Sequence, residues 1–512
     1  MIILALVGVR FARRQRDTET YFVAKRSVPA WAMGMSLVAT IITSVTFIAY
    51  PGSGYAGNWS LLVPGAMVVI VLMIVGAVLI PFFRHVVRMS AYEYFERRFG
   101  YFARVYSSIA FAAGHFSKMG FVFYLLSLTV SSMSGWNVDR VIMVAGAVTV
   151  FYTLIGGIEA VIWADVIQGF VLWTGVLVSI GFLLFLPPGG PAHVLAVAAQ
   201  NHKFSFGSTD FAFSRPTIIV LSLYGFFFYL QKYSADQTVV QRYLVAKSDR
   251  GALRGIALGA SLCIPAWTLF MFIGTLLWSF YHITGEKLPS YITKSDQVFP
   301  HFLTTHVPVG LAGLFLATLF GAAMSSLSSD LNALSVVAVE DFYRKVRPQC
   351  TDPERLKAAK AFVAIFGLLT VIIAIRLAHT KGTALALYYA ISAIVAGGLA
   401  GLFLLAFLSI RAGRKSAYIG IIASLVFTAW ATLTMKGGKM VDLGTWNFPL
   451  HEYMIGVIGN IVLLGVGYFA AFVFSEADEK KRSMTVWGWL DQVKMRRDQE
   501  LQGSASQAEA EG

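Results

Sequence analysis

Charged residues are scarce in this sequence. Asp, Glu, Lys and Arg make up 13% of its 512 residues, whereas hydrophobic residues make up 57%. A water-soluble protein normally carries about 25% charged residues. Because so few charges cannot cover a water-exposed surface, the composition predicts a membrane protein that is embedded in the lipid bilayer.

Residues that bind structural metals or form covalent intermediates are also few. The two cysteines, Cys263 and Cys350, lie in an apolar stretch and a loop, so no disulfide is expected. The nine histidines are scattered, and there is no P-loop, no HExxH pair and no GxSxG motif. These absences disfavour a metalloenzyme or a covalent enzyme. We expect no catalytic residues and no cofactor.

Long apolar runs are abundant instead. About 20 helical residues cross the roughly 30 Å hydrocarbon core of a bilayer. A first apolar run, 1–12, is too short, and its arginines follow it rather than precede it, which argues against a signal peptide. We interpret it as an incomplete first helix. Twelve longer stretches are expected to span the membrane: 29–55, 58–83, 104–132, 138–157, 160–187, 217–244, 252–283, 308–343, 358–378, 383–410, 416–436 and 452–475.

The distribution of basic residues supports this count. Cytoplasmic loops of membrane proteins collect Lys and Arg. Alternating the loops across the membrane places thirty of these residues on one side, with Arg242 counted in a cytoplasmic loop, and nine on the other. We therefore expect about thirteen transmembrane helices in a plasma (inner) membrane, with the N-terminus outside and the C-terminus cytoplasmic. The same asymmetry accounts for the net charge of +14 without nucleic acid as a partner.

A few charges lie within the predicted spans, where each is a functional-site hypothesis. They include Lys118, Lys232 and Asp165. Either lysine could instead be neutralised by a packed carboxylate or reach a water-filled vestibule. For Lys118 the candidate partners are a substrate carboxylate or a protein carboxylate such as Asp165. Asp236 directly precedes a basic loop, so it is expected to order a helix end.

Two predicted spans contain polar interruptions at corresponding positions. The segment SLVATIITSVTFIAYPGSGYAG (36–57) alternates hydroxyls with β-branched residues, and LYGFFFYLQKYSADQ (223–237) breaks an aromatic run with polar side chains. The second segment lies five spans after the first. Paired interruptions of this kind indicate an inverted repeat with a binding site near the bilayer midplane.

The segment GAAMSSLSSDLNALS (321–335) places hydroxyls in an apolar helix. Ala322, Ser325, Ser326 and Ser329 share one helical face, because they are spaced i, i+3, i+4 and i+7. Hydroxyls together with carbonyls from a broken helix could bind a hard cation such as sodium. Small residues also allow close helix packing, so spacing alone leaves both interpretations open.

Four segments resemble the solute:sodium symporter family. They are YFVAKRSVPAWAMGMSLVAT (21–40), AVIWADVIQGF (160–170), DQTVVQRYLVAKS (236–248) and AAMSSLSSDLNALSVVAVEDFYRK (322–345). The resemblance runs from about residue 20 to 475. The segments ATIITSVTF and SAYEYFERRFG are most similar to the sialic acid branch of the family. The resemblance implies an all-α membrane protein with a leucine-transporter-type five-plus-five inverted repeat.

This fold implies a division into six parts. They are a short first helix and cytoplasmic link (1–28), the first repeat (29–187), an extracellular loop (188–216), the second repeat (217–410), two peripheral helices (411–476) and a partly disordered cytoplasmic tail (477–512).

The resemblance also implies two sodium sites. The residues that match the family's shared site are Ala39, Ile42 and Ala322 through their carbonyls and Ser325 and Ser326 through their hydroxyls. The residues that match the second site of the sialic acid branch are Asp165, Ser325, Ser328 and Ser329.

The expected substrate is less closely defined. Lys118 matches an arginine that faces the substrate carboxylate in the sialic acid branch, so the charge is kept but the bidentate fork is lost. Thr43 and Thr46 match hydroxyl-lined positions, whereas Ile41 is apolar and Pro64 or Gly65 stands where the branch has a glutamine. These departures favour a sialic acid-like or smaller organic anion, such as a sugar acid or monocarboxylate. A neutral sugar is the alternative if Lys118 pairs internally.

The resulting expectation is a monomeric, sodium-coupled secondary active symporter that imports a small organic solute by alternating access, with sodium ions as coupling ligands. A channel would instead need a continuous polar pore and no pair of broken helices. A membrane-embedded enzyme would need a His, Ser or carboxylate dyad, and the sequence suggests none.

Overall fold

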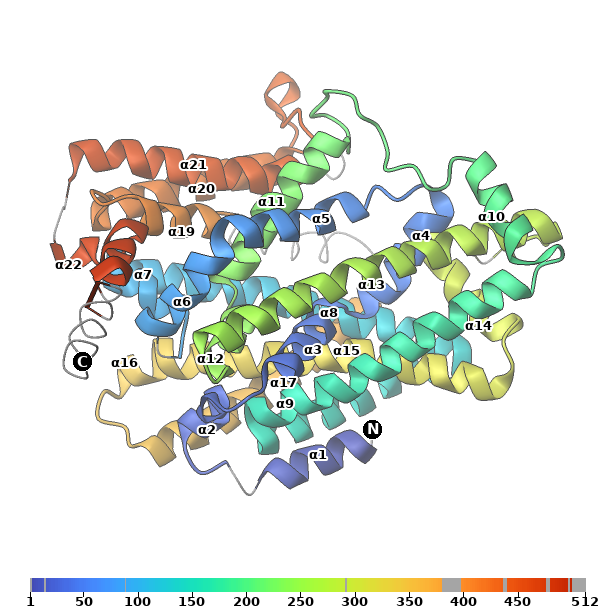
Figure 1. Ribbon diagram of the computed structural model, residues 1–512, viewed down its shortest axis with the longest axis horizontal. Coiled ribbons are helices and arrows are strands. Elements are labelled where there is room, and N and C mark those ends of the chain that lie inside the picture. The colour runs from blue at the N-terminus through green and yellow to red at the C-terminus, as the bar shows by residue number, and fades with distance from the viewer. Residues whose placement is uncertain are drawn as a thin grey trace, which may run out of the picture.

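The protein is described by a computed structural model that covers residues 2–12, 15–87, 89–290, 292–379, 397–435, 440–475, 479–495 and 498–499. Within these ranges the chain forms helices and connecting loops, and a single β-bridge joins Val28 to Ala246. Figure 1 shows the long helices packed along one another. The helices are α1 (Ile2–Ala12), α2 (Thr18–Val23), α3 (Ala30–Ile41), α4 (Ser44–Ala56), α5 (Leu62–Val71), α6 (Ala77–Val86), α7 (Tyr92–Phe99), α8 (Tyr101–Ser134), α9 (Val138–Phe185), α10 (Gly190–Gln200), α11 (Ile218–Ala235), α12 (Gln237–Val245), α13 (Asp249–Thr284), α14 (Val298–Thr305), α15 (Val309–Val337), α16 (Arg344–Val346), α17 (Asp352–His379), α19 (Leu399–Leu408), α20 (Arg414–Thr434), α21 (Tyr453–Val473) and α22 (Glu479–Arg482).

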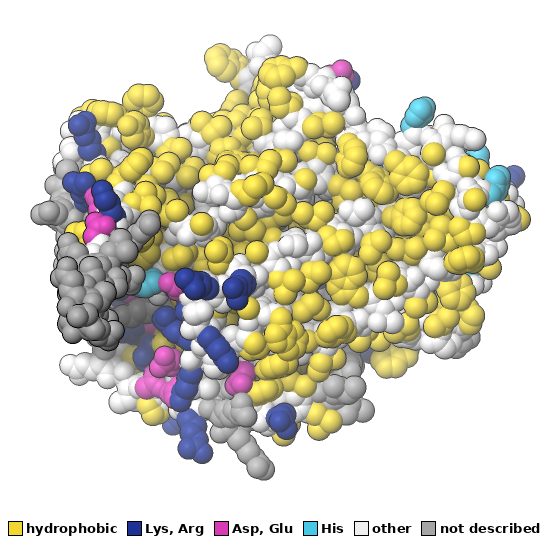
Figure 2. Space-filling model, in the orientation of Figure 1, with side chains coloured by type: hydrophobic (Ala, Val, Ile, Leu, Met, Phe, Trp, Pro, Cys, Tyr) yellow, Lys and Arg dark blue, Asp and Glu magenta, His cyan; other side chains and the backbone are white. Residues whose placement is uncertain are grey.

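The helices have the length and composition of membrane spans. Among the described residues, seven helices are long and apolar enough to cross a bilayer, and the number rises to nine if each of two bent pairs counts as one span. Figure 2 shows apolar side chains over most of the visible face, with Lys and Arg gathered near α2 and α12. The predicted span 383–410 lies partly outside the described residues, so the count of about thirteen remains a prediction.

The first predicted interruption separates α3 from α4, whose axes differ in direction by 61°. Ile42 leaves the helical conformation with φ −82° and ψ 112°. The Thr43 hydroxyl accepts a hydrogen bond from the Val45 N–H at 3.1 Å, and the Thr43 N–H donates to the Thr46 hydroxyl at 3.4 Å. These bonds cap the start of α4, where helical N–H groups have no partner in their own helix.

The second predicted interruption separates α11 from α12 at Asp236, which has φ −96° and ψ 115°. The Asp236 carboxylate accepts a hydrogen bond from the Thr238 N–H at 2.9 Å and thereby caps α12. Asp236 thus has the helix-end role expected from the sequence, although every residue of α12 is buried.

One long helix covers two predicted spans. The stretches 138–157 and 160–187 both lie in α9, which has 48 residues and leaves helical geometry at Gly157, with φ 58° and ψ −160°. Tyr21 packs against this point, and a Cβ atom on residue 157 would lie 2.8 Å from its side chain. Glycine is therefore required here for both conformation and space. The expected link between the spans is a kink rather than a loop.

α13 packs against both halves of the broken α3–α4 span. A Cβ atom at Gly34 would lie 2.8 Å from the Gly255 carbonyl, and one at Gly54 would lie 2.5 Å from the Met271 carbonyl. Small residues let helix backbones approach this closely within a membrane protein. Because α13 packs closely against α3 and also against α4, these contacts fix the orientation of the two helices relative to each other.

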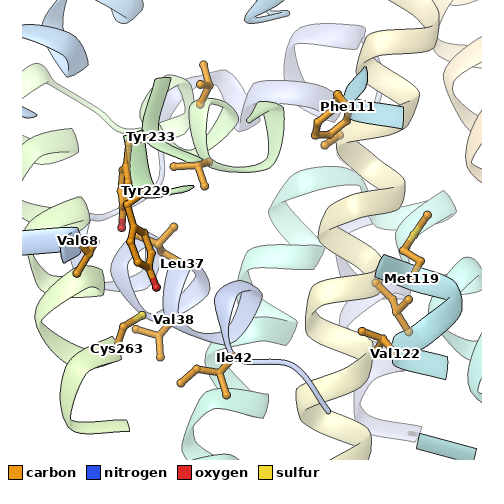
Figure 3. Close-up of a cluster of buried hydrophobic side chains, with 14 of the residues drawn as sticks. Leu37, Val38, Ile42, Val68, Phe111, Met119, Val122, Tyr229, Tyr233 and Cys263 are labelled. Atoms are coloured by element: carbon orange, nitrogen blue, oxygen red, sulfur yellow. The ribbon is translucent and has the colours of Figure 1, made fainter. Parts of the chain in front are cut away.

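Apolar side chains complete the packing around the break. Figure 3 shows Leu37 and Val38 of α3, and Ile42 directly after it, near Tyr229 of α11 and Cys263 of α13, and all of these residues are buried. α15 packs along α9 and also contacts α3 and α8. The serine-rich part of α15 lies beside the break, because the Ser325 hydroxyl donates to the Ala39 carbonyl near the end of α3.

Candidate sodium and substrate sites

Ser325 connects α15 to the end of α3. Its hydroxyl donates to the Ala39 carbonyl at 2.7 Å and lies 3.3 Å from the Ala322 carbonyl. Ser325, Ala39 and Ala322 are all buried. The structure thus brings together three of the five residues predicted for the shared sodium site. It places three oxygen atoms close together without a charged group among them.

The other two residues of the predicted shared site lie next to these three. Ile42 follows the last residue of α3, where helix carbonyls lack a partner in their own helix. Ser326 is fully buried, and its hydroxyl donates to the Ala323 carbonyl of α15 at 3.2 Å. No described contact joins Ser326 to α3. Both residues stay candidates by position.

Asp165 of α9 lies at the predicted second site and is fully buried. Its Oδ2 atom accepts a hydrogen bond from the Ser36 hydroxyl at 2.6 Å and lies 3.5 Å from the Ser329 hydroxyl. Its Oδ1 atom is buried without a hydrogen-bond partner in the described structure. Ser328 donates instead to the Ser325 carbonyl at 3.1 Å. One carboxylate oxygen therefore remains available for a cation.

Arg242 is a member of this site that the sequence did not reveal. Its Nη2 atom lies 3.2 Å from Asp165 Oδ2 and 2.7 Å from the Ser329 hydroxyl. The charge distribution placed Arg242 in a cytoplasmic loop, and this expectation was wrong because α12 is entirely buried. The available signal was its position within DQTVVQRYLV, where two valines precede Gln241 and Arg242 and the residues Tyr243, Leu244 and Val245 follow them. Asp165 and Arg242 are named here the sealed pair.

A polar cavity of about 400 Å³ lies beside the break and contains all three predicted substrate residues. Thr43 and Thr46 line it from the α3–α4 span, and Lys118 lines it from α8. A more apolar cavity of about 560 Å³ between α8, α9 and α15 is lined by none of the predicted ligand residues. The polar cavity is therefore the candidate substrate site.

Lys118 pairs with Asp330, a carboxylate that was not among the partners expected from the sequence. Its Nζ atom lies 2.9 Å from Oδ2 of Asp330, a fully buried residue of α15. The suggested pairing with Asp165 is wrong, because Asp165 pairs with Arg242. The Lys118 side chain nevertheless keeps 26% of its surface exposed, and it lines the cavity. The signal for Asp330 was its place directly after the serine stretch.

Four further contacts extend this pair into a network. His115 Nε2 lies 3.1 Å from Asp236 Oδ2, and His115 Nδ1 lies 2.9 Å from Asp330 Oδ1. Asp236 also forms an ion pair with Lys232 and caps α12. His115, Lys118, Lys232, Asp236 and Asp330 are named here the cavity charge cluster, and all except Asp330 line the cavity.

A helical bundle with two broken spans, buried oxygen atoms at one break and a polar cavity beside it has the architecture of a secondary transporter. The family model described as the sodium:solute symporter family matches residues 21–424. The chain belongs to the sodium:solute symporter family.

Two relatives match almost the whole chain. The sodium/sialic acid symporter NanT of Aliivibrio fischeri is 33% identical over 495 residues, which cover 94% of this chain and 95% of that protein. The sodium/sialic acid symporter SiaT of Proteus mirabilis is 32% identical over 480 residues, which cover 93% and 94%. These two matches confirm the sequence resemblance to the sialic acid branch of the family.

Solved structures confirm the fold. A Na⁺-coupled sialic acid symporter in a substrate-bound outward-open state matches with a TM-score of 0.86 and 31% identity, covering 93% of this chain and 97% of that one. Mhp1, a nucleobase-cation-symport-1 family transporter, matches in a closed conformation with a TM-score of 0.58 and 16% identity, covering 91% and 97%. The second match supports the fold alone.

Proposed function

We propose that this protein is a sodium-coupled secondary active symporter that imports a small organic anion by alternating access. The observation that carries the proposal is the contact of Ser325 with Ala39, which lies beside a cavity lined by Lys118. A cation held between α15 and the end of α3 would fix the orientation of the break. The same break positions Thr43 and Thr46 in the cavity wall, so sodium and substrate would stabilise one arrangement together.

The sodium ligands are proposed residue by residue. The first ion would be held by the carbonyls of Ala39, Ile42 and Ala322 and the hydroxyls of Ser325 and Ser326. The second ion would be held by Asp165, Ser325, Ser328 and Ser329. The unpartnered Oδ1 atom of Asp165 supports the second site, because Arg242 contacts only Oδ2.

The substrate is proposed to carry a carboxylate that faces Lys118. The exposure of this ammonium group to the cavity supports the assignment, as does the similarity to sialic acid symporters. Because lysine offers a point charge rather than a bidentate fork, a sialic acid-like acid, a sugar acid or a monocarboxylate would all fit the class. Thr43 and Thr46 would contact its hydroxyl groups.

A neutral sugar is the second candidate, and one observation favours it. Lys118 already pairs with Asp330, so its charge is compensated without a ligand.

For either substrate we propose a monomer in the plasma (inner) membrane, with its N-terminus outside and its C-terminus in the cytoplasm. We propose transport alone, with no enzymatic activity.

Uptake into proteoliposomes tests this function. Purified protein would be reconstituted and given an inward sodium gradient, with radiolabelled sialic acid, gluconate, lactate and galactose as separate probes. We expect sodium-driven accumulation of at least one of the three acids and none with an equal potassium gradient. Accumulation of galactose alone would favour the neutral sugar, and equal uptake with either cation would contradict sodium coupling.

A further inference from the structure

His115 contacts two carboxylates with its two ring nitrogens. Nε2 lies 3.1 Å from Asp236 Oδ2 in hydrogen-bond geometry, and Nδ1 lies 2.9 Å from Asp330 Oδ1. The Nδ1 contact lacks the alignment of a hydrogen bond, so it is an electrostatic contact. Only 7% of the His115 side chain is exposed, and it lines the cavity. Water therefore cannot easily replace either carboxylate.

This geometry places a carboxylate next to each ring nitrogen of His115. A neutral imidazole has one N–H and one nitrogen lone pair, whereas an imidazolium has two N–H groups. In either neutral tautomer, one unprotonated ring nitrogen would lie about 3 Å from a carboxylate oxygen, and both groups carry partial or full negative charge. An added proton converts that repulsion into attraction. The structure of the cluster therefore provides a place for one proton.

The surrounding charges make this proton relevant to substrate binding. Lys118 and Lys232 contribute two positive charges, and Asp236 and Asp330 contribute two negative charges. With a neutral His115 the cluster has no net charge, so a bound carboxylate would add an uncompensated negative charge in a poorly hydrated region. With a protonated His115 the cluster carries one positive charge and matches a monoanion.

We propose that His115 is a proton-binding site of the transporter and that a proton on its ring is bound together with the anionic substrate. The proposal deepens the proposed function, because it explains how a cavity whose lysines are already paired accepts an anion. Proton and anion binding are then coupled reciprocally, so each increases the affinity for the other. No bond other than the N–H bond of the ring forms or breaks.

Neighbouring helices leave few other groups that could take this role. Lys118 lies on the same helix, Lys232 and Asp236 come from the end of α11, and Asp330 comes from α15. Arg242 of α12 interacts electrostatically with both aspartates. From within α8, Phe111 packs against the ring at 4.1 Å between centroids. Among these groups, only an imidazole ordinarily gains or loses its proton between pH 5 and 8.

The first test measures sialic acid binding to purified protein in sodium buffer between pH 5.5 and 8.5. We expect its affinity to rise as the pH falls, by up to about tenfold per pH unit for one linked proton. His115→Gln should bind sialic acid more weakly and with no pH dependence. His379→Gln is the matched control, because His379 also contacts a carboxylate, Asp139, but on the surface. It should retain the wild-type profile.

The second test needs no substrate. Protein with ¹⁵N-labelled histidine would be titrated over the same pH range, and the His115 resonances would be assigned by their loss in His115→Gln, or in His115→Asn if the glutamine variant misfolds. Uptake of a proton by this ring within the range supports the proposal. A ring that stays neutral throughout overturns it, whichever solute is transported. A protonating ring without sialic acid binding would instead count against sialic acid as substrate and leave the proton site standing.

Discussion

The two buried charge groups of this protein differ in their access to water. The sealed pair of Asp165 and Arg242 has no exposed side-chain surface at all. In the cavity charge cluster, Lys118 and Lys232 keep 26% and 18% of their side-chain surface exposed, while their aspartate partners lie deeper. Both groups consist of basic residues paired with aspartates. Their surroundings therefore decide what each can do.

The comparison distinguishes charges that stabilise the packing of the helices from charges that can form a new ion pair with a ligand. A fully buried ion pair cannot lose one member without leaving an uncompensated charge in a low-dielectric region. A lysine at a cavity wall can turn towards an incoming anion, because its aspartate keeps a second partner in His115. We therefore assign substrate contact to the cavity charge cluster. We assign to the sealed pair a structural role, because its contacts join α9 to α12 and, through Ser329, to α15.

Breaking the sealed pair should have the largest effect. Asp165→Asn leaves the Arg242 guanidinium buried without its counter-charge, which should destabilise the protein by about 3–5 kcal/mol. Thermal unfolding in detergent measures the loss. The double variant Asp165→Asn with Arg242→Gln should recover part of it, since no buried charge is then unpaired. A stable single variant, or a double variant that merely adds both losses, would contradict this account.

The Lys118→Gln variant should have the next largest effect. Loss of a hydrogen bond to a charged group should weaken anion binding by about 2–3 kcal/mol, or roughly 30- to 150-fold in Kd. Sodium binding without substrate should change little, because Lys118 contacts neither proposed sodium site. Lys118→Arg should retain anion binding with altered selectivity. Separate sodium and substrate titrations decide the question: intact substrate affinity with lost sodium affinity would remove Lys118 from the substrate site.

A third charge group, which is partly exposed, should have the smallest effect. Glu96 of α7 keeps 22% of its side-chain surface exposed and pairs with Arg104 and Lys345. Burial alone would raise the pKa of Glu96, but hydrogen bonds from Lys345 and Arg104 outweigh it, so the pKa lies below its usual value. The pairing therefore stabilises the fold at neutral pH and is lost as the pH falls through that lowered pKa.

Glu96→Gln should accordingly destabilise the protein by no more than about 1 kcal/mol at pH 7, as expected for a solvent-accessible ion pair. The difference from wild type should vanish in strongly acidic buffer, where the wild-type carboxylate is also neutral. Parallel unfolding curves at the two pH values measure this. A loss of stability as large as that of Asp165→Asn would show that solvent exposure does not determine how much each charge group contributes to stability.

The sequence predicted the elements of the site better than their pairing. The breaks at Ile42 and Asp236 follow from local polar interruptions and capping residues, so they were visible in single segments. Arg242 and Asp330 were missed as partners because their contacts join helices that are far apart in sequence. Asp330 lies 212 residues from Lys118, and Arg242 lies 77 residues from Asp165. Spacing along one helix carries no information about such contacts.

The charge distribution gave one misleading result for a related reason. Counting basic residues in loops assumes that arginines near a span end are hydrated, and this holds for an average loop. α12 is an exception, because it follows a broken helix and continues inside the bundle. The cavity itself could not be predicted, since its residues come from α3, α4, α8, α11, α12 and α19 together.

The most direct test of the central claim is the sodium dependence of stability. Purified protein would be unfolded thermally in sodium and in potassium at equal ionic strength, for wild type, Ser325→Ala and Ser335→Ala. Ser335 is the matched control, because it is also buried in α15 but its hydroxyl donates to the Asn332 carbonyl of the same helix. A ligand that binds only the folded state stabilises it by about 2.7 kcal/mol at 100 times its Kd. We predict that sodium raises the unfolding temperature of wild type and Ser335→Ala while potassium does not, and that Ser325→Ala loses the rise. An equal rise with both ions, or an undiminished rise in Ser325→Ala, would contradict a sodium site between α3 and α15.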